Sequence, residues 1–193
     1  MLPRLKIAAL VFALAATAGL AAFAGTRDDA GMPTSQAGMA APDFTGIDRW
    51  HNSAPLTLGQ LRGKVVLVDF WTYSCINCIH TIPYVKEWDR KYRDQGLVVV
   101  GVHTPEYPFE RDAGNVADAI KRFGIQYPVA QDNRYDTWRA YGNQYWPALY
   151  LIDASGKVVY TRYGEGEYDK TEAAIRGALA QAGEGAKGAT RTQ

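Results

Sequence analysis

The sequence predicts an α/β fold in which a mixed central sheet is covered by helices on both faces. Two valine-rich runs, at 65–70 and 97–102, have the composition of strands that are buried on both sides. Between them, apolar residues recur at three- and four-residue spacing, which is typical of a helix with one buried face. Near the C-terminus, strand-like runs at 148–152 and 158–163 flank a short turn and therefore predict an antiparallel hairpin.

The other elements follow from periodicity and from glycine stops. The first half is predicted to contain a short hairpin and a helical turn (43–63), a strand from 65, a helix after the cysteines that ends before Gly96, and a strand (97–102). The second half is predicted to contain a charged loop to Asn115, a helix (116–123), a strand (127–130), a short helix (135–141), the hairpin, and a last helix (169–182) that stops at Gly183. This order of elements gives a mixed sheet with helices on both faces.

Length and composition indicate one globular domain, at 43–183. The chain has 193 residues, of which 47% are hydrophobic and 21% are charged, as in ordinary folded domains. Its formal net charge is +1, and without residues 1–24 it is −1, so neither value indicates a nucleic-acid partner. The last ten residues, 184–193, are predicted to be a disordered tail.

The N-terminus has the pattern of a secretory signal. Arg4 and Lys6 precede an apolar run at 7–24, which ends in Ala-Phe-Ala and suits a signal-peptidase site. The run is 18 residues long, near the lower limit for crossing a bilayer, so an uncleaved membrane anchor is the alternative. Either way the domain is expected outside the cytoplasm, in a periplasmic or similar compartment. Residues 25–42 are predicted to be a flexible linker.

Cys75 and Cys78, the only cysteines of the chain, form a C-x-x-C motif where the first strand meets the following helix. A helix N-terminus favours a thiolate, so Cys75 is predicted to be the nucleophile of thiol–disulfide exchange, and Cys78 is predicted to resolve the mixed disulfide. An inert disulfide staple is the alternative, but a loop of two residues would constrain almost nothing. A zinc site would need about four ligands, and a c-type haem would need histidine directly after Cys78, where Ile79 stands. We therefore expect no metal and no cofactor.

Asp69 lies within the first valine-rich run, where burial should raise the pKa of its carboxyl group. It is a candidate for exchanging a proton with Cys78, and the alternative is that it only fixes the strand against a polar pocket. His103 and Glu106 follow the second strand at the same predicted edge of the sheet. They would either touch the site or serve as ordinary loop residues.

With these features the chain resembles the thioredoxin superfamily, and more closely its exported TlpA/ResA-like branch, which includes the periplasmic domain of DipZ-type proteins. Asp69 lies six residues before Cys75 and Trp71 four before it, as in that family. Pro83 follows Cys78 by five residues, where the family kinks its helix, and Trp146-Pro147 takes the place of the family's cis-proline loop. The resemblance implies a thioredoxin fold with an N-terminal hairpin extension and a catalytic dithiol.

The resemblance also implies how clients bind. Trp146 and a cis Pro147 would offer backbone groups to an extended client segment, which would pair with them as an added strand. Trp71, Tyr73 and Trp146 would form an aromatic rim around the thiols, although core packing is the first expectation for Trp71. The dipeptide Ile76-Asn77 replaces the Gly-Pro of thioredoxin and leaves the reduction potential open.

The function implied is that of an exported thiol–disulfide oxidoreductase that needs no cofactor. It would act on client proteins with disulfides or thiols, as a reductase supplied by a membrane electron donor of the DsbD/CcdA type, with residues 7–24 as an optional tether. One alternative is a peroxide reductase, because Thr72 and Cys75 form the Thr-x-x-Cys of peroxiredoxins, although Val68 stands where that family has proline. Another is a non-catalytic docking module whose dithiol only senses redox state.

Overall fold

The computed structural model describes residues 37–190, with side chains up to residue 185. The signal or anchor predicted at 1–24 and most of the linker predicted at 25–42 lie outside the described residues. The strands are β1 (Arg49–His51), β2 (Val65–Trp71), β3 (Leu97–His103), β4 (Val129–Gln131), β5 (Ala148–Ile152) and β6 (Val158–Tyr163). The α-helices are α1 (Ile76–Tyr92), α2 (Ala113–Phe123), α3 (Asp136–Ala140) and α4 (Tyr168–Thr190), and short 3-10 helices span Arg93–Gln95 and Pro108–Arg111.

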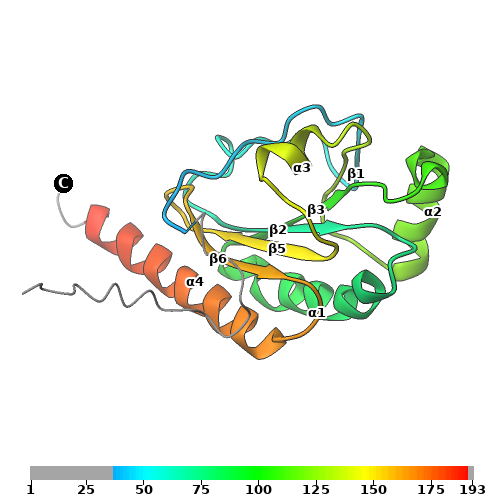
Figure 1. Cartoon of the computed structure of the whole chain (residues 1–193). Coiled ribbons are helices and arrows are strands. Elements are labelled where there is room, and N and C mark those ends of the chain that lie inside the picture. Colours follow the sequence, from blue (N-terminus) through cyan, green and yellow to red (C-terminus); the bar gives the residue numbers. More distant parts are fainter. Residues whose placement is uncertain (1–36, 191–193) are drawn as a thin grey trace, which may run out of the picture. The chain divides into compact units, whose positions relative to one another are not determined.

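Within residues 37–190 the strands form one mixed sheet in the order β1-β4-β3-β2-β5-β6 (Figure 1). β2, β3 and β4 run parallel, whereas β5 pairs antiparallel with β2, and β6 with β5. The parallel register sets Asp69 opposite Gly101 and Trp71 opposite His103. The carboxyl ends of β2 and β3 therefore meet at one edge of the sheet, which is where the C-x-x-C motif follows β2.

β2 is the strand around which the core is built, and all seven of its residues are buried. Leu67 and Trp71 belong to a hydrophobic cluster that includes residues of α1, α2 and α4. Val68 and Phe70, which alternate with them, belong to a second cluster that includes residues of α3. Figure 1 shows α1 and α4 on the opposite face of the sheet from α3. The predicted mixed sheet with helices on both faces is confirmed.

Local sequence explains where α1 and α2 begin and where α2 ends. Cys75 is the N-cap of α1, with the extended backbone (φ −72°, ψ 116°) that this position requires. Asp112 caps α2 by accepting a hydrogen bond from the backbone N–H of Asn115, so α2 begins at Ala113, three residues before the predicted start. Gly124 ends α2 in the left-handed region at φ 62°, where glycine carries no steric penalty.

Three expectations differ from the structure. Residues 43–63 contain one strand, β1, which pairs with β4 in the sheet, and so the predicted N-terminal hairpin is wrong. α4 continues to Thr190, past the predicted stop at Gly183, because Gly183 does not adopt the left-handed conformation that ends a helix. Residues 38–41, assigned to the linker from sequence, form backbone hydrogen bonds with residues 156–158. None of the helices in residues 37–190 is long and apolar enough to span a membrane.

Candidate active site

The two cysteines lie at the start of α1, which follows the fully buried strand β2. The backbone N–H of Cys78 donates a hydrogen bond to the Cys75 sulfur over 3.4 Å. Both residues are free thiols in this structure. Cys75 is half-buried and keeps some access to solvent, whereas Cys78 is only 1% exposed. The helix geometry therefore presents one sulfur outward and holds the other beneath it.

The surroundings of the two thiols lower the pKa of Cys75 and raise that of Cys78. A hydrogen bond from the Cys78 thiol lowers the pKa of Cys75, partial burial opposes this, and the N–H groups of Cys78 and Asn77 lower it further, to about 7 from an ordinary 9.0. Burial, followed by the hydrogen bond to Cys75, raises the pKa of Cys78. Near neutral pH a substantial fraction of Cys75 is therefore a thiolate while Cys78 stays protonated, which is the pairing that thiol–disulfide exchange requires.

Alkylation of the reduced protein is expected to reflect this difference. Iodoacetamide reacts with thiolates, so the rate should rise with a midpoint near pH 7, and mass spectrometry of peptides should find the label on Cys75. The Cys78→Ala variant loses the thiol hydrogen bond and should shift the midpoint upward. Equal labelling of both cysteines in the native protein would contradict the assignment.

Asp69 is a buried carboxyl group close to the dithiol. It is 1% exposed, and its Oδ1 has no hydrogen-bond partner within the described residues. Burial, together with the charge of Cys75, raises the pKa of Asp69 to about 7. Asp69 alternates with Val68 and Phe70 along β2 and so faces the α1 side of the sheet. Its position and acidity allow it to gain and lose a proton over the same pH range as Cys75.

The Trp146–Pro147 loop lies at the same end of the sheet as the dithiol. Ala148 pairs with Phe70 near the end of β2, which brings the preceding loop toward the start of α1. The Trp146–Pro147 peptide bond is cis. Trp146 is half-buried, and its indole N–H donates to the Thr104 carbonyl over 3.0 Å. This contact ties the loop to the segment that follows β3.

The residues of the predicted aromatic rim differ in how far they are buried. Trp71 is fully buried and packs edge-to-face on His103 with ring centroids 5.2 Å apart, so the predicted client-binding role for Trp71 is wrong. Its position on the inward face of β2 leaves no surface for a client. Tyr73 is half-buried and stacks on His103 with centroids 5.6 Å apart.

His103 is the last residue of β3 and packs against both of these rings. It is fully buried, its Nε2 lies 3.3 Å from the Thr72 hydroxyl, and burial lowers its pKa to about 4, so the imidazole is neutral. Glu106 is exposed in the following loop, and its charge raises the pKa of Cys75. Neither residue is a hydrogen-bond partner of the dithiol.

Glu110 is the residue that sequence reasoning missed. Its side chain is fully buried and accepts hydrogen bonds from the N–H and hydroxyl of Ser74, at 3.3 and 2.5 Å, and from the N–H groups of Glu106 and Tyr107. Burial raises the pKa of Glu110, but these hydrogen bonds outweigh it and hold the net value below the ordinary one. A glutamate three residues after the N-cap of a proline-led helical turn is a capping-box signal that could have indicated this role.

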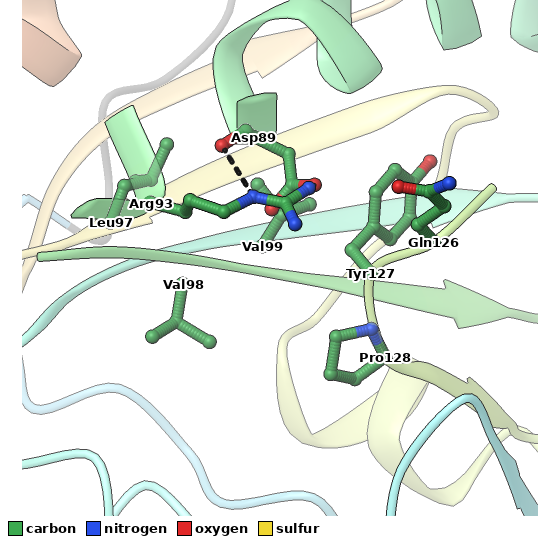
Figure 2. Close-up of a pocket in the computed structure, with 8 residues that line it drawn as sticks. All are labelled: Asp89, Arg93, Leu97, Val98, Val99, Gln126, Tyr127 and Pro128. Carbon is green, nitrogen blue, oxygen red and sulfur yellow. Dashed lines mark hydrogen bonds and ion pairs between the residues drawn. The ribbon is translucent and has the colours of Figure 1, made fainter. Parts of the chain in front are cut away.

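The pocket in Figure 2 does not belong to this site. It lies where α1 ends and β3 begins, and an Asp89–Arg93 ion pair borders it. Asp89 is fourteen residues beyond Cys75, or about 21 Å along the helix axis. The dithiol lies at the other end of α1 from this pocket.

Comparisons with known proteins agree with this geometry. A family model described as Redoxin matches residues 36–179. Protein DipZ of Mycobacterium bovis is 54% identical over 150 residues, which cover 76% of this chain and 22% of DipZ. Thiol-disulfide oxidoreductase YkuV of Bacillus subtilis is 33% identical over 141 residues, covering 72% of this chain and 94% of YkuV. The solution structure of a thioredoxin-like protein in the oxidized form gives a TM-score of 0.69 at 30% identity, covering 77% of this chain and 99% of that one.

A mixed sheet of this topology, with an acidic thiol at the start of α1 and a second thiol one turn inside, defines a thiol–disulfide oxidoreductase of the thioredoxin superfamily. The chain belongs to the Redoxin family, in its TlpA/ResA-like branch. It spans about a fifth of the length of DipZ, since the aligned stretch is 22% of that protein.

Proposed function

We propose that this protein is an exported reductase that passes electrons from a membrane donor of the DsbD/CcdA type to disulfides in client proteins. The observation that carries the proposal is the pKa of about 7 for Cys75, beside a protonated Cys78. In this fold, a nucleophilic cysteine with a pKa of about 7 accompanies a reducing dithiol, and one of about 3.5 a strongly oxidising one. A moderately stabilised thiolate does not make the reduced form much more stable than the disulfide form. The reduced protein can therefore pass its electrons to a client disulfide.

The reaction proceeds by two exchanges. The Cys75 thiolate attacks one sulfur of the client disulfide, which forms a mixed disulfide and releases the first client thiolate. Cys78 then loses its proton and attacks the Cys75 sulfur, which closes the Cys75–Cys78 disulfide and releases the second client thiolate. The client has gained two electrons and, from solvent, two protons. A donor dithiol restores the enzyme by the same exchange in reverse.

Asp69 is the proton acceptor that we propose for Cys78. Burial keeps Cys78 protonated and therefore unreactive until a base removes its proton. Because the pKa of Asp69 is about 7, a substantial fraction of this carboxyl group is ionised at neutral pH and can accept that proton. Without such a base, the high pKa of Cys78 would make resolution of the mixed disulfide slow.

The client segment would dock between the Trp146–Pro147 loop and Tyr73. Both lie at the edge of the sheet that carries Cys75, and both are packed against the same hydrophobic cluster as Cys75. Backbone groups of Trp146 would pair with an extended client segment, which gives affinity without selecting one sequence. Tyr73 replaces Trp71 as the aromatic neighbour of the client.

Export is supported by the signal-like sequence before residue 25 and by the similarity to DipZ over most of the chain. A periplasmic or similar location would allow client disulfides to persist until the protein reduces them. The 7–24 run would either be cleaved or hold the domain at the membrane, close to its donor.

The test is to measure the reduction potential in a glutathione series and to follow reduction of a peptide disulfide. A potential nearer to about −270 mV than to about −120 mV is expected, together with efficient peptide reduction. A value at the oxidising end would overturn the direction of electron flow. Stopped-flow consumption of hydrogen peroxide far above that of free cysteine would instead favour the peroxide reductase.

A further inference from the structure

Two exposed aromatic side chains lie near the dithiol and have no place in the mechanism. Tyr107 and Phe109, in and beside the 3-10 helix after β3, are 49% and 55% exposed. Their rings are parallel to within 2°, with centroids 5.6 Å apart. Phe109 also lies beside Tyr73, with ring centroids 6.2 Å apart. We refer to Tyr73, Tyr107 and Phe109 as the aromatic strip.

The aromatic strip is fastened to the turn that carries Cys75. The buried Glu110 carboxylate accepts hydrogen bonds from Ser74 on one side and from the N–H groups of Glu106 and Tyr107 on the other. The Tyr73 hydroxyl donates to the Phe109 carbonyl over 3.1 Å. Charge-assisted hydrogen bonds such as those to Glu110 hold their partners firmly. The exposed rings therefore keep a fixed position relative to the nucleophile.

The aromatic strip is continuous with the surface that any client must touch. Tyr73 is two residues before Cys75, and Ile76, the residue after Cys75, is 60% exposed. A client disulfide that reaches the Cys75 sulfur brings its flanking residues over these side chains. Apolar and aromatic faces exposed next to a reactive group lose unfavourable contact with water when they are covered.

We propose that the aromatic strip is a specificity site, which selects client disulfides flanked by an aromatic or large apolar residue in an extended segment. The inference rests on the proposed function and adds to it the class of client. A parallel pair of exposed rings offers a third ring an edge-to-face or offset-stacked position. Glu110 is a positioning residue in this arrangement, because it fixes the strip and does not reach its surface.

The experiment compares three substrates with the full-length protein. Two disulfide-bridged peptides differ only in phenylalanine or serine beside one cysteine, and a small aliphatic disulfide serves as a substrate with neither a peptide nor an aromatic ring. The native protein should prefer the phenylalanine peptide in kcat/KM by about tenfold, which corresponds to one well-formed aromatic contact. The Tyr107→Ala/Phe109→Ala variant should lose that preference through a higher KM, and the other two rates should change by less than about twofold.

Tyr84→Ala is the matched control. Tyr84 is an exposed aromatic residue further along α1, and it stacks on Tyr168 of α4. It should retain the full preference. A Phe109→Leu variant, which keeps an apolar surface, should retain part of it. Equal loss of activity with all three substrates would overturn the proposal, because the strip would then only position the thiols.

Two further outcomes separate the inference from the proposed function. If the native protein reduces both peptides equally well, the specificity site is wrong and the reductase stands. If it reduces none of the three substrates, the proposed function fails and the specificity site fails with it. A dimer in sedimentation that Tyr107→Ala/Phe109→Ala abolishes, with no change in peptide preference, would assign the strip to a second copy of the chain and overturn the proposal.

Discussion

The Cys78→Ser variant is expected to accumulate as a mixed disulfide between Cys75 and its client. The thiolate of Cys75 can still attack, but no neighbouring thiol remains to release the client. An oriented intramolecular group acts at an effective concentration of about 10⁵ M or more, whereas an added thiol acts at millimolar concentration. Turnover should therefore fall by at least about a thousandfold. Non-reducing gels and intact-mass spectrometry would detect the adduct, and a peptide assay would measure the rate.

Cys75→Ser is the control for the accumulation of the mixed disulfide. It keeps the buried Cys78, whose pKa is raised by burial, and so it should form no adduct and show no turnover. An adduct through Cys78 in this variant would reverse the two roles. Because Cys78 is 1% exposed, a client disulfide could reach its sulfur only if the first turn of α1 opened.

Replacing Asp69 with asparagine is expected to stabilise the protein above neutral pH. The pKa of Asp69 is raised from 3.8 to about 7 in the fold. As the pH rises between these values, the unfolded chain loses the proton and the folded chain retains it, so the free energy of unfolding falls by about 1.4 kcal/mol per pH unit. The free energy of unfolding is thus highest while Asp69 is protonated in both the folded and the unfolded chain, at low pH, and this advantage is lost by about pH 7. The asparagine side chain does not titrate, so the variant would avoid this loss.

Urea unfolding of the reduced proteins at pH 5 and pH 8 measures the effect. The stability of Asp69→Asn relative to the native protein should increase by about 3 kcal/mol between these pH values. Asp118→Asn, on the exposed surface of α2, is the control for the loss of one acidic side chain. A constant difference between Asp69→Asn and the native protein across this range would show that the carboxyl group is not held protonated by the fold.

The same substitution should reduce activity. Without the carboxylate, Cys78 has no base to accept its proton, and removal of a general base commonly costs about a hundredfold or more. The rate of disulfide reduction, plotted against pH, should lose the rise that follows ionisation of Asp69. An unchanged pH profile would exclude the proton role. We therefore expect Asp69→Asn to be more stable than the native protein above neutral pH and less active. This combination is expected where a buried charge destabilises the fold but serves catalysis.

The central sheet was predictable because its strands carry a local signal. The valine-rich runs of β2 and β3 and the hairpin of β5 and β6 have apolar sequences bounded by turns, and each was placed within about a residue or two. β1 was misassigned because a three-residue strand has almost no periodicity. Its partner, β4, is about eighty residues distant, and pairing at that separation has no local signature.

Some residues of the site were likewise predictable from the local sequence, and others were not. Cys75, Cys78 and Asp69 lie on one strand and the helix turn that follows it, so their place in the fold could be predicted from their spacing. Core packing was the first expectation for Trp71, and its place in the aromatic rim came from the resemblance; alternation along a strand gives two faces without saying which one is covered. Helices packed on that face bury it, and this depends on segments far away in the sequence.

The sequence by itself determined the α/β class, the dithiol at the end of a buried strand, and a carboxyl group within its core. These features depend on short-range periodicity and spacing, which a chain carries before it folds. Only the tertiary structure decided that Glu110 holds the Cys75 turn and that Tyr107 and Phe109 form a surface beside it. The Ser74–Glu110 contact joins residues 36 positions apart, and burial of the Glu110 carboxylate is favourable only once the folded chain brings Ser74 to it.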